Sequence, residues 1–527
     1  MDPVALLLEE ISKTKPVSRV DLRKLKTTVA ARTGTPLIRN DALLRQYRQE
    51  VAQGVRQPDE RLTRILMLNS SRSESGIATV TVITEPYACP GRCVYCPTEA
   101  RAPKSYLTNE PAIRRALRND YDPYRQVMSR LQALDETGHA TDKIELIIKG
   151  GTWSFYPAAY QERFIQQCFQ AANEFKASTI AHETHTLEAT QLQNETAPNR
   201  MIGMTIETRP DYIDDAEILR LRRLGVTRVE LGVQTLEEHV LELTIRDHGT
   251  AHIQQATRLL KDAGFKVAYH LMPNLPGATP QSDLACARQL FDDPAYRPDT
   301  MKIYPCVVIE SAELFDWWRE GRYTPYDDET LIDLLIAIKQ QVPPWLRLER
   351  VIRDIPAPSI RAGSTVSNLR EEVLRRMRTQ GLSCQCIRCR QVRGPVHGPL
   401  TMIRREYDAS AGKEIFLSFE DAVSNQLAAF LRLRLTKLKA FVRELHVYGE
   451  HLPLAAHTEH AAQHHGLGKE LLKEAERITC QEHDVRRLDV IAGVGVREYY
   501  RRLGYQLEET YMVKKLKVSD TFLAKSV

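Results

Sequence analysis

Between residues 76 and 310, short apolar runs typical of buried strands alternate with longer stretches that have helical spacing. Six runs are predicted to be strands, at residues 78–85, 144–149, 202–207, 228–233, 267–272 and 301–305. Between them, apolar residues recur three or four positions apart, as at Ala256, Leu259, Leu260 and Ala263. Strands that alternate with helices form parallel sheets, so we expect an α/β fold, here a partial (β/α)6 barrel.

A second, α+β pattern begins near residue 399. Its predicted strands are residues 400–406, 414–419, 440–448, 488–492 and 509–517, and its predicted helices are 466–479 and 496–503. Residues 1–75 are mostly helical and basic in pattern. The predicted units are the N-terminal segment 1–75, the barrel 76–341, an arginine-rich, cysteine-containing linker 342–398, and the C-terminal domain 399–527.

Composition agrees with a soluble protein of several domains. The 527 residues are too many for one core, and 43% are hydrophobic and 27% charged. No apolar run approaches the roughly 18 residues of a membrane span, and the N-terminus carries acids where a signal peptide is basic. We therefore expect a cytoplasmic protein with no membrane association. Six of the ten cysteines fall in two tight groups, which indicates metal binding rather than disulfides.

Positive charge is concentrated in one region. The net charge is only +5, but residues 347–405 hold thirteen arginines, no lysine and four acids. A second basic stretch covers residues 13–56. Such concentration is typical of a protein that binds a phosphate backbone, so both regions are predicted to contact nucleic acid. The alternative is a pair of solvated helical faces.

Cys89, Cys93 and Cys96 carry the clearest chemical signal. Their C-x3-C-x2-C spacing on a loop suits a [4Fe–4S] cluster in which the fourth iron has no protein ligand. That open iron can chelate S-adenosylmethionine, and one electron then yields a 5′-deoxyadenosyl radical. A zinc site is the alternative, but zinc usually takes four ligands and no further Cys or His is near in sequence.

A glycine-bearing loop precedes the predicted helix at 466–479. The pattern Gln463-x-x-Gly466-x-Gly468 lets backbone amides approach an anion at a helix N-terminus. With the strand before it and the segment Gly493–Tyr505 after it, this order is similar to the site at which an acyl-CoA N-acetyltransferase (GNAT) domain holds the CoA pyrophosphate. An ordinary helix cap beside buried aromatic residues is the alternative.

The two domains, in this order, resemble the tRNA uridine(34) acetyltransferase family, which includes the catalytic subunit of Elongator. The single-chain bacterial or archaeal form fits best, and the resemblance covers nearly the whole chain. The matching strings include Cys93-Val-Tyr-Cys96-Pro, Tyr121-Asp-Pro-Tyr124, Gly150-Gly151-Thr152, Thr205-Ile-Glu207-Thr-Arg209-Pro, Glu230-Leu-Gly-Val-Gln234, Lys302-Ile-Tyr304-Pro and Glu444-Leu-His446-Val.

This resemblance implies an activity. S-adenosylmethionine and acetyl-CoA would meet a tRNA anticodon loop, and the radical would take hydrogen from the acetyl methyl group. The carbon would add to C5 of the wobble uridine, and thioester hydrolysis would leave a carboxymethyl group. The resemblance also implies an external electron donor, while it leaves open whether the protein is a monomer or a homodimer.

The resemblance assigns roles to further residues. Gly150 and Gly151 would take the methionine amino group of S-adenosylmethionine, or else form a tight turn. Glu207 and Arg209 are candidate catalytic residues and Gln234 a candidate cofactor contact at strand ends; a structural ion pair is the alternative. The predicted acetyl-CoA contacts are Lys143, Glu444, Leu445, His446, Val447, Leu467, Gly468, Lys469 and Tyr500. Tyr500 could also act as an acid toward the thioester, whereas His464 and His465 are predicted to be spectators.

Cys384, Cys386 and Cys389 form a second group, C-x-C-x2-C, which the family does not share throughout. Three thiolates suggest a structural zinc, with Cys306 or a histidine as the fourth ligand. A metal-free, redox-sensitive cluster is the alternative. Two other functions remain open at this point: a protein lysine acetyltransferase in which the iron–sulfur cluster is structural, and a tRNA-binding scaffold without catalysis.

Overall fold

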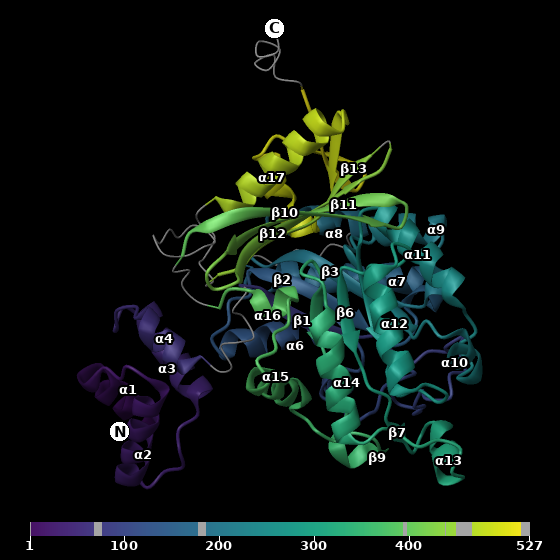
Figure 1. The fold of residues 1–527 in the computed structure, drawn as a ribbon. Helices are drawn as coiled ribbons and strands as arrows, with labels where there is room; N and C mark the ends of the chain where they lie inside the picture. The colour runs from purple at the N-terminus through teal and green to yellow at the C-terminus, as the bar shows by residue number, and fades with distance from the viewer. Residues whose placement is uncertain are drawn as a thin grey trace.

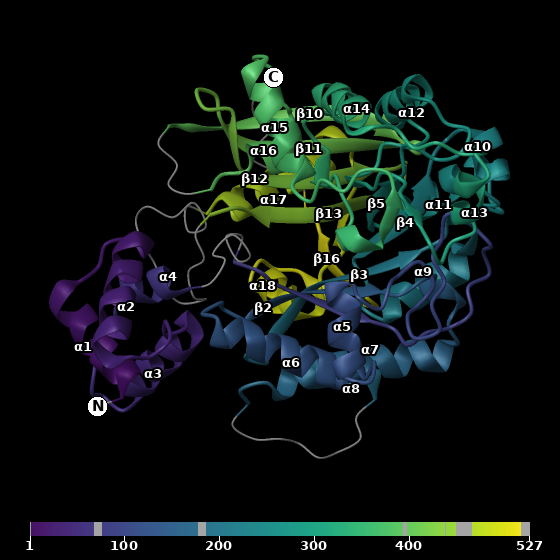
Figure 2. The same ribbon diagram turned by 90° about the horizontal axis from the view of Figure 1, so that it is seen from below.

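The N-terminal helices form a group of their own beside the rest of the molecule (Figures 1 and 2). The computed structural model describes residues 2–67, 76–177, 186–393, 398–437, 439–449 and 466–517. The first four helices are α1 (Pro3–Thr14), α2 (Arg19–Thr33), α3 (Asn40–Ala52) and α4 (Glu60–Leu66). Their leucines form a small separate core. Arg48 of α3 lies 3.3 Å from Asp135 of helix α6 (Pro123–Glu136), which ties this group to the barrel.

A seven-stranded parallel sheet forms the centre of the molecule, in the order β1-β2-β3-β4-β5-β6-β8. The strands are β1 (Ala78–Ile83), β2 (Lys143–Lys149), β3 (Arg200–Thr208), β4 (Arg228–Gln234), β5 (Lys266–Leu271), β6 (Thr300–Ile303) and β8 (Arg347–Arg350). All six predicted strands are present, so the predicted partial barrel is confirmed. The seventh strand was not predicted.

Most helices of the barrel pack on the outer face of this sheet (Figure 1). They are α6 (Pro123–Glu136), α7 (Ala158–Glu174), α8 (Leu187–Asn194), α9 (Asp215–Arg223), α11 (Thr250–Asp262), α12 (Pro280–Asp292) and α14 (Asp328–Gln341). The short helices α5 (Pro111–Arg118) and α10 (Glu238–Leu243) pack in two smaller apolar clusters. Alternate side chains of each strand face the helices. In β2, Leu146 is buried in the core that also holds Phe164 of α7, and Glu145 and Lys149 face the inside of the barrel. The inner face is therefore free to carry polar groups.

Within the predicted linker 342–398, residues 342–393 carry secondary structure and fold against the barrel. They contribute β8, β9 (Ile360–Ala362), α15 (Leu369–Thr379) and α16 (Ile387–Arg390), and β9 pairs with β7 (Val308–Ile309) beside helix α13 (Leu314–Arg319). Leu348, Leu369 and Val373 are buried in the barrel core. These few apolar anchors lie among many arginines, so their pattern was not evident in the sequence.

The C-terminal domain is a second seven-stranded sheet, which lies across the top of the barrel in Figure 1. Its elements are β10 (Leu400–Ala409), β11 (Gly412–Asp421), β12 (Gln426–Leu435), β13 (Ala440–Val447), α17 (Leu467–Arg477), β14 (Arg487–Val490), α18 (Arg497–Arg501), β15 (Gln506–Glu508) and β16 (Tyr511–Lys515). Only β13 and β14 pair in parallel; the other neighbours are antiparallel. Strands β12 and β15 were not predicted.

Two glycines let the C-terminal domain approach the barrel closely. A Cβ atom on Gly493 would lie 2.1 Å from the backbone oxygen of Ile202, and one on Gly495 would lie 2.5 Å from Cβ of Arg200. Both barrel residues belong to β3. The two glycines of Gly493-Val-Gly495 therefore allow the C-terminal domain to pack directly against β3. Within the described ranges, no helix has the length and apolar character needed to cross a membrane.

Candidate functional site

One cavity of about 1420 Å³ lies between the inner face of the barrel and the C-terminal sheet. Cys89, Cys93 and Cys96 line it on the barrel side. Gly468 and Lys469, at the start of α17, line it on the other side. The structure thus brings together two sites that the sequence indicated separately and that lie more than 350 residues apart.

The cysteine loop follows β1 and opens into the cavity. Cys93 is buried, and its pKa is lowered to about 5 by a hydrogen bond from the Cys96 thiol and by the nearby Arg246 guanidinium. The Cys89 sulfur instead lies 3.8 Å from the hydroxyl oxygen of Thr152.

Sulfur spacing separates the two cysteine groups. Among the described residues, the ligand atoms of Cys384, Cys386 and Cys389 all lie within 4.8 Å of one another, whereas those of the first group do not. Four thiolates around one zinc at about 2.3 Å stand roughly 3.8 Å apart, while a four-iron cluster holds its cysteines further apart. The compact group therefore fits a single ion, and in the first group at least one pair of sulfurs lies more than 4.8 Å apart, although Cys93 and Cys96 are hydrogen-bonded.

Gly150 and Gly151 follow β2 with φ angles of 134° and 82°, a region that favours glycine. A Cβ atom on Gly150 would lie 2.0 Å from Thr84 Oγ1, so no side chain fits there. A Cβ atom on Gly151 would have no atom within 4 Å, and this residue lines the cavity. The turn thus exposes backbone at Gly151 to a ligand in the cavity.

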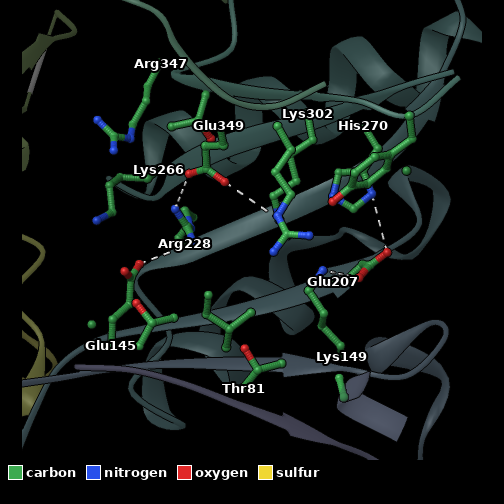
Figure 3. A pocket seen from close by; sticks show the side chains of 18 of the residues that line it. Thr81, Glu145, Lys149, Glu207, Arg228, Lys266, His270, Lys302, Arg347 and Glu349 are labelled. Atoms are coloured by element: carbon green, nitrogen blue, oxygen red, sulfur yellow. Dashed lines mark hydrogen bonds and ion pairs between the residues drawn. The ribbon is translucent and has the colours of Figure 1, made fainter. Parts of the chain in front are cut away.

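Charged side chains from every strand after β1 project into the barrel interior, and Figure 3 shows how they converge. Glu230 of β4 is fully buried and lies 2.9 Å from His270 of β5 and 3.6 Å from Lys149 of β2. Glu207 of β3 lies 3.3 Å from Lys149. Burial alone would raise the pKa of Glu207, but Lys149 and His270 hold it at about 2. The interior is a preorganised ionic network rather than an apolar core.

Two predicted site residues keep polar atoms without partners among the described residues. Arg209 binds Asp211 through Nε and Nη2 at 2.9 and 2.8 Å, while its buried Nη1 atom is unpaired. Gln234 has a φ of 71° and a buried, unpaired Oε1 atom. The structural ion pair considered for Arg209 is present, and the remaining donor and acceptor suit a polar ligand.

The C-terminal side of the cavity is formed where two strands separate. Strand β13 pairs with β14 only from Ala440 to Val442, so residues 444–447 leave that partner before the strand ends. All four of these residues line the cavity: Glu444, Leu445, His446 and Val447. Burial lowers the pKa of His446 to about 4, which keeps its ring neutral at neutral pH.

The remaining predicted acetyl-CoA contacts differ in position. Tyr500 lines the cavity and is 6% exposed. Leu467 is buried in the C-terminal core, and Lys143 is half-buried at the start of β2; neither is among the lining residues. Tyr499 was not predicted, yet its hydroxyl lies 3.4 Å from where a Cβ atom on Gly468 would be. Gln463, His464 and His465 lie outside the described residues.

The second cysteine group lies beside α14, where the Lys339 amine approaches Cys389 Sγ at 3.7 Å. Cys306, one of the expected fourth ligands, belongs instead to the apolar cluster around Cys93 and Leu314, so it does not complete this site. Among the described residues, no fourth Cys, His or acid lies within 4.8 Å of all three sulfurs.

The arginines of residues 347–405 divide into two sets. Five of them line the cavity: Arg347, Arg350, Arg353, Arg388 and Arg393. Others are held in ion pairs elsewhere, as Arg376 is with Glu329 and Arg405 is with Glu420. Positively charged side chains of this segment therefore lie both in the cavity and outside it.

Comparison with known proteins shows which family this chain resembles. Residues 86–288 match the radical SAM superfamily, and residues 298–379 match the radical SAM C-terminal domain. The tRNA uridine(34) acetyltransferase of Dehalococcoides mccartyi is 46% identical over 467 residues, covering 85% of this chain and 100% of that protein. The chain belongs to this family.

Two other relatives span more of the chain, and a solved structure spans nearly as much. The tRNA uridine(34) acetyltransferase of Methanocaldococcus jannaschii is 41% identical and covers 97% of this chain and 96% of its own length. Elongator complex protein 3 of Homo sapiens is 36% identical, with 98% and 96% covered. The solved structure of Methanocaldococcus infernus Elp3 with an N-terminal deletion matches with a TM-score of 0.74 and 40% identity, covering 84% of this chain and 100% of that one. The predicted family, the radical SAM barrel and the enzyme class are thus confirmed.

Most of the ionic network inside the barrel was not predicted from the sequence. Lys149, Glu230, His270 and Lys302 were not predicted as site residues. A signal existed in the alternation of charged and apolar residues, as in Lys143-Ile-Glu145-Leu along β2, which puts charges on one face of a strand. In a barrel, that face is the interior.

Proposed function

We propose that this enzyme adds a carboxymethyl group to C5 of the wobble uridine of tRNA, using S-adenosylmethionine and acetyl-CoA. The observation that carries the proposal is the single cavity that joins the cysteine loop to the start of α17. A radical formed at one side and an acetyl group bound at the other could react only if both open into the same space. The family membership supports the same substrates.

Cys89, Cys93 and Cys96 would hold a [4Fe–4S] cluster, and their C-x3-C-x2-C spacing and the open cavity that all three line fit that group. When bound, the cluster would supply one electron to S-adenosylmethionine and so start radical chemistry at an unactivated carbon. Gly151 would offer backbone to the methionine amino group. The unpaired atoms of Arg209 and Gln234 would hydrogen-bond to the rest of this cofactor. An external reductant must supply the electron.

Acetyl-CoA would bind in the C-terminal half of the cavity. The order of seven strands, with one parallel pair that separates, is similar to that of a GNAT domain and supports this assignment. Backbone groups of residues 444–447 that β14 does not pair could bind the pantetheine amides. Gly468 and Lys469 at the N-terminus of α17 would bind the pyrophosphate. Tyr500 would donate its phenol proton toward the thioester, and hydrolysis would release the product.

The tRNA anticodon loop would enter between the domains. The five arginines that line the cavity would bind phosphates there, and the basic helices α1–α3 would bind more of the tRNA. Cys384, Cys386 and Cys389 would hold a structural zinc that fixes the segment between the domains. Cytoplasmic location and a monomeric or homodimeric state remain predictions.

Replacement of Cys89 by alanine tests the proposal against its alternatives. We expect Cys89→Ala to abolish uridine modification, while the matched control Cys480→Ala, outside the cavity and both cysteine groups, retains it. Lysine acetylation that persists in Cys89→Ala, with unmodified RNA in the wild type, would instead favour a protein acetyltransferase. RNA binding with neither reaction in any variant would indicate a scaffold.

A further inference from the structure

Arg246 lies against the cysteine loop. It belongs to the connection between α10 and α11, and its side chain is buried. Its Nη1 atom lies 3.4 Å from the Cys93 sulfur, and its Nη2 atom donates to the backbone oxygen of Gly232 at 2.5 Å. The flanking residues Ile245 and Asp247 have φ angles of 53° and 60°. Such backbone is unfavourable for these residues, so the surrounding packing must hold the connection in this conformation.

Glycine at position 232 makes room for this guanidinium. A Cβ atom on Gly232 would lie 2.5 Å from Arg246 Nη2, and the φ angle of Gly232 is not in the glycine-favouring region. The glycine is therefore required by space and not by backbone conformation. Gly91 makes room for a second guanidinium in the same way, since a Cβ atom on Gly91 would lie 2.3 Å from Arg209 Nη1. Two guanidinium groups thus approach the cysteine loop through gaps that glycines leave.

The two arginines differ in their charge balance. Arg209 is paired with the carboxylate of Asp211. Within the described part of the chain, no carboxylate lies within 4 Å of Arg246, which hydrogen-bonds to the Cys93 sulfur and to the carbonyl oxygen of Gly232. A buried cation without an anionic partner is strongly unfavourable. The negative charge that balances Arg246 must therefore come from the cysteine thiolates.

A four-iron cluster on three thiolates carries one net negative charge when oxidised and two when reduced by one electron. A fixed positive charge in a buried setting stabilises the reduced form more than the oxidised form. We propose that Arg246 is a positioning residue that raises the reduction potential of the cluster through its hydrogen bond to Cys93. One electron passes from an external one-electron donor to the cluster; no covalent bond changes and no proton moves in this step.

This inference rests on the cluster assignment in the proposed function, but its test needs neither tRNA nor acetyl-CoA. The reconstituted holoenzyme is titrated anaerobically, and the reduced cluster is followed by electron paramagnetic resonance. At a fixed potential, Arg246→Gln should lower the ratio of reduced to oxidised cluster at least tenfold, which is a shift of about 59 mV to more negative values. Arg246→Lys, which keeps the charge, should shift the potential less.

Two further variants make the result specific. Arg92→Gln removes an exposed charge one residue from Cys93, where water screens it, and should leave the potential unchanged. Gly232→Ala keeps the arginine but displaces its guanidinium, and should shift the potential in the same direction as Arg246→Gln.

Three outcomes would overturn the proposal. The first is a wild-type potential in a fully loaded Arg246→Gln enzyme, and the second is an equal shift in Arg92→Gln. The third is loss of the cluster from Arg246→Gln, Arg246→Lys and Gly232→Ala alike, which would make Arg246 a support of the loop only. A wild-type protein that binds no four-iron cluster would instead refute the proposed function itself.

Discussion

Asp299 of the barrel and Arg443 of the C-terminal sheet form an ion pair in which neither side chain is exposed, with Nη1 and Oδ2 2.8 Å apart. Arg443 also donates to Glu414 of β11 at 2.9 Å and to the backbone oxygen of Phe265. Asp299 directly precedes β6, and Arg443 lies on β13, whose next residues line the cavity. This pair therefore fixes the relative position of the two halves of the site.

Removing the charge of Asp299 should destabilise the protein markedly. In Asp299→Asn, Arg443 would keep a buried charge without its barrel partner, and breaking a buried pair lowers the free energy of unfolding by about 3–5 kcal/mol. Urea unfolding of purified wild type and variant measures the difference. The exposed pair Arg350–Asp354 is the control, and Asp354→Asn should change the free energy by less than about 1 kcal/mol. An equally small change in the free energy of unfolding in both variants would show that the buried pair contributes little to stability.

The same pair predicts sensitivity to acid. Burial alone would raise the pKa of Asp299 and of Glu414, but Arg443 and Lys261 hold both pKa values below their usual range. Carboxylates with lowered pKa values stabilise the fold above the unfolded-state values of about 3.9 and 4.3, and this stabilisation is lost as the pH falls further. Unfolding free energy should thus decline below about pH 4, and less steeply in Asp299→Asn. A parallel decline in both proteins would contradict this account.

Tyr500 should matter for acetyl-CoA chemistry more than for folding. Tyr500→Phe removes the phenol that we propose as an acid, and should lower acetyl-CoA turnover about 100-fold with little change in acetyl-CoA affinity. Turnover is measured by thiol release and affinity by calorimetry. Tyr505→Phe is the matched control, because Tyr505 shares the same core but its hydroxyl binds Glu476. Loss of turnover in Tyr499→Phe and not in Tyr500→Phe would move this role to Tyr499.

Much of the fold followed from the sequence because strands β1–β6 are short segments rich in valine, isoleucine and other apolar residues, with helical stretches between them. Strands β8 and β12 were not predicted because both contain arginines, Arg347 and Arg350 in β8 and Arg432 and Arg434 in β12, which are more often exposed than part of a sheet core. In β12, however, Arg432 and Arg434 are fully buried and paired with acids of other elements. Only tertiary structure supplies such partners, so no local pattern could have identified β12 as a buried strand.

The candidate site was predictable to a similar degree. Cysteine spacing and glycine turns are local signals, and they identified both ends of the cavity. That Cys93 and Gly468 face the same cavity depends on how the two domains pack, and the role of Glu230 depends on four neighbouring strands. The fourth ligand of the second cysteine group was wrongly sought at Cys306 because sequence separation does not reveal which core a cysteine joins.

The second cysteine group should bind one metal ion per chain. Elemental analysis of protein purified without added metal should find zinc in the wild type and in Cys480→Ala, and no zinc in Cys386→Ala. Because the group connects α16 to α14 and α15, its loss should also lower the melting temperature. Wild-type protein that is free of metal yet equally stable would favour the redox-sensitive alternative.

The most direct test of the central claim is a product analysis under anaerobic conditions. The reconstituted enzyme is incubated with dithionite, S-adenosylmethionine, acetyl-CoA and unmodified tRNA, and the nucleosides are identified by mass spectrometry. We predict carboxymethylated uridine at the wobble position together with 5′-deoxyadenosine, and no modified uridine when acetyl-CoA is left out. Unmodified uridine from an enzyme with a fully loaded cluster and bound acetyl-CoA would contradict the claim that the two halves of the cavity serve one reaction on tRNA.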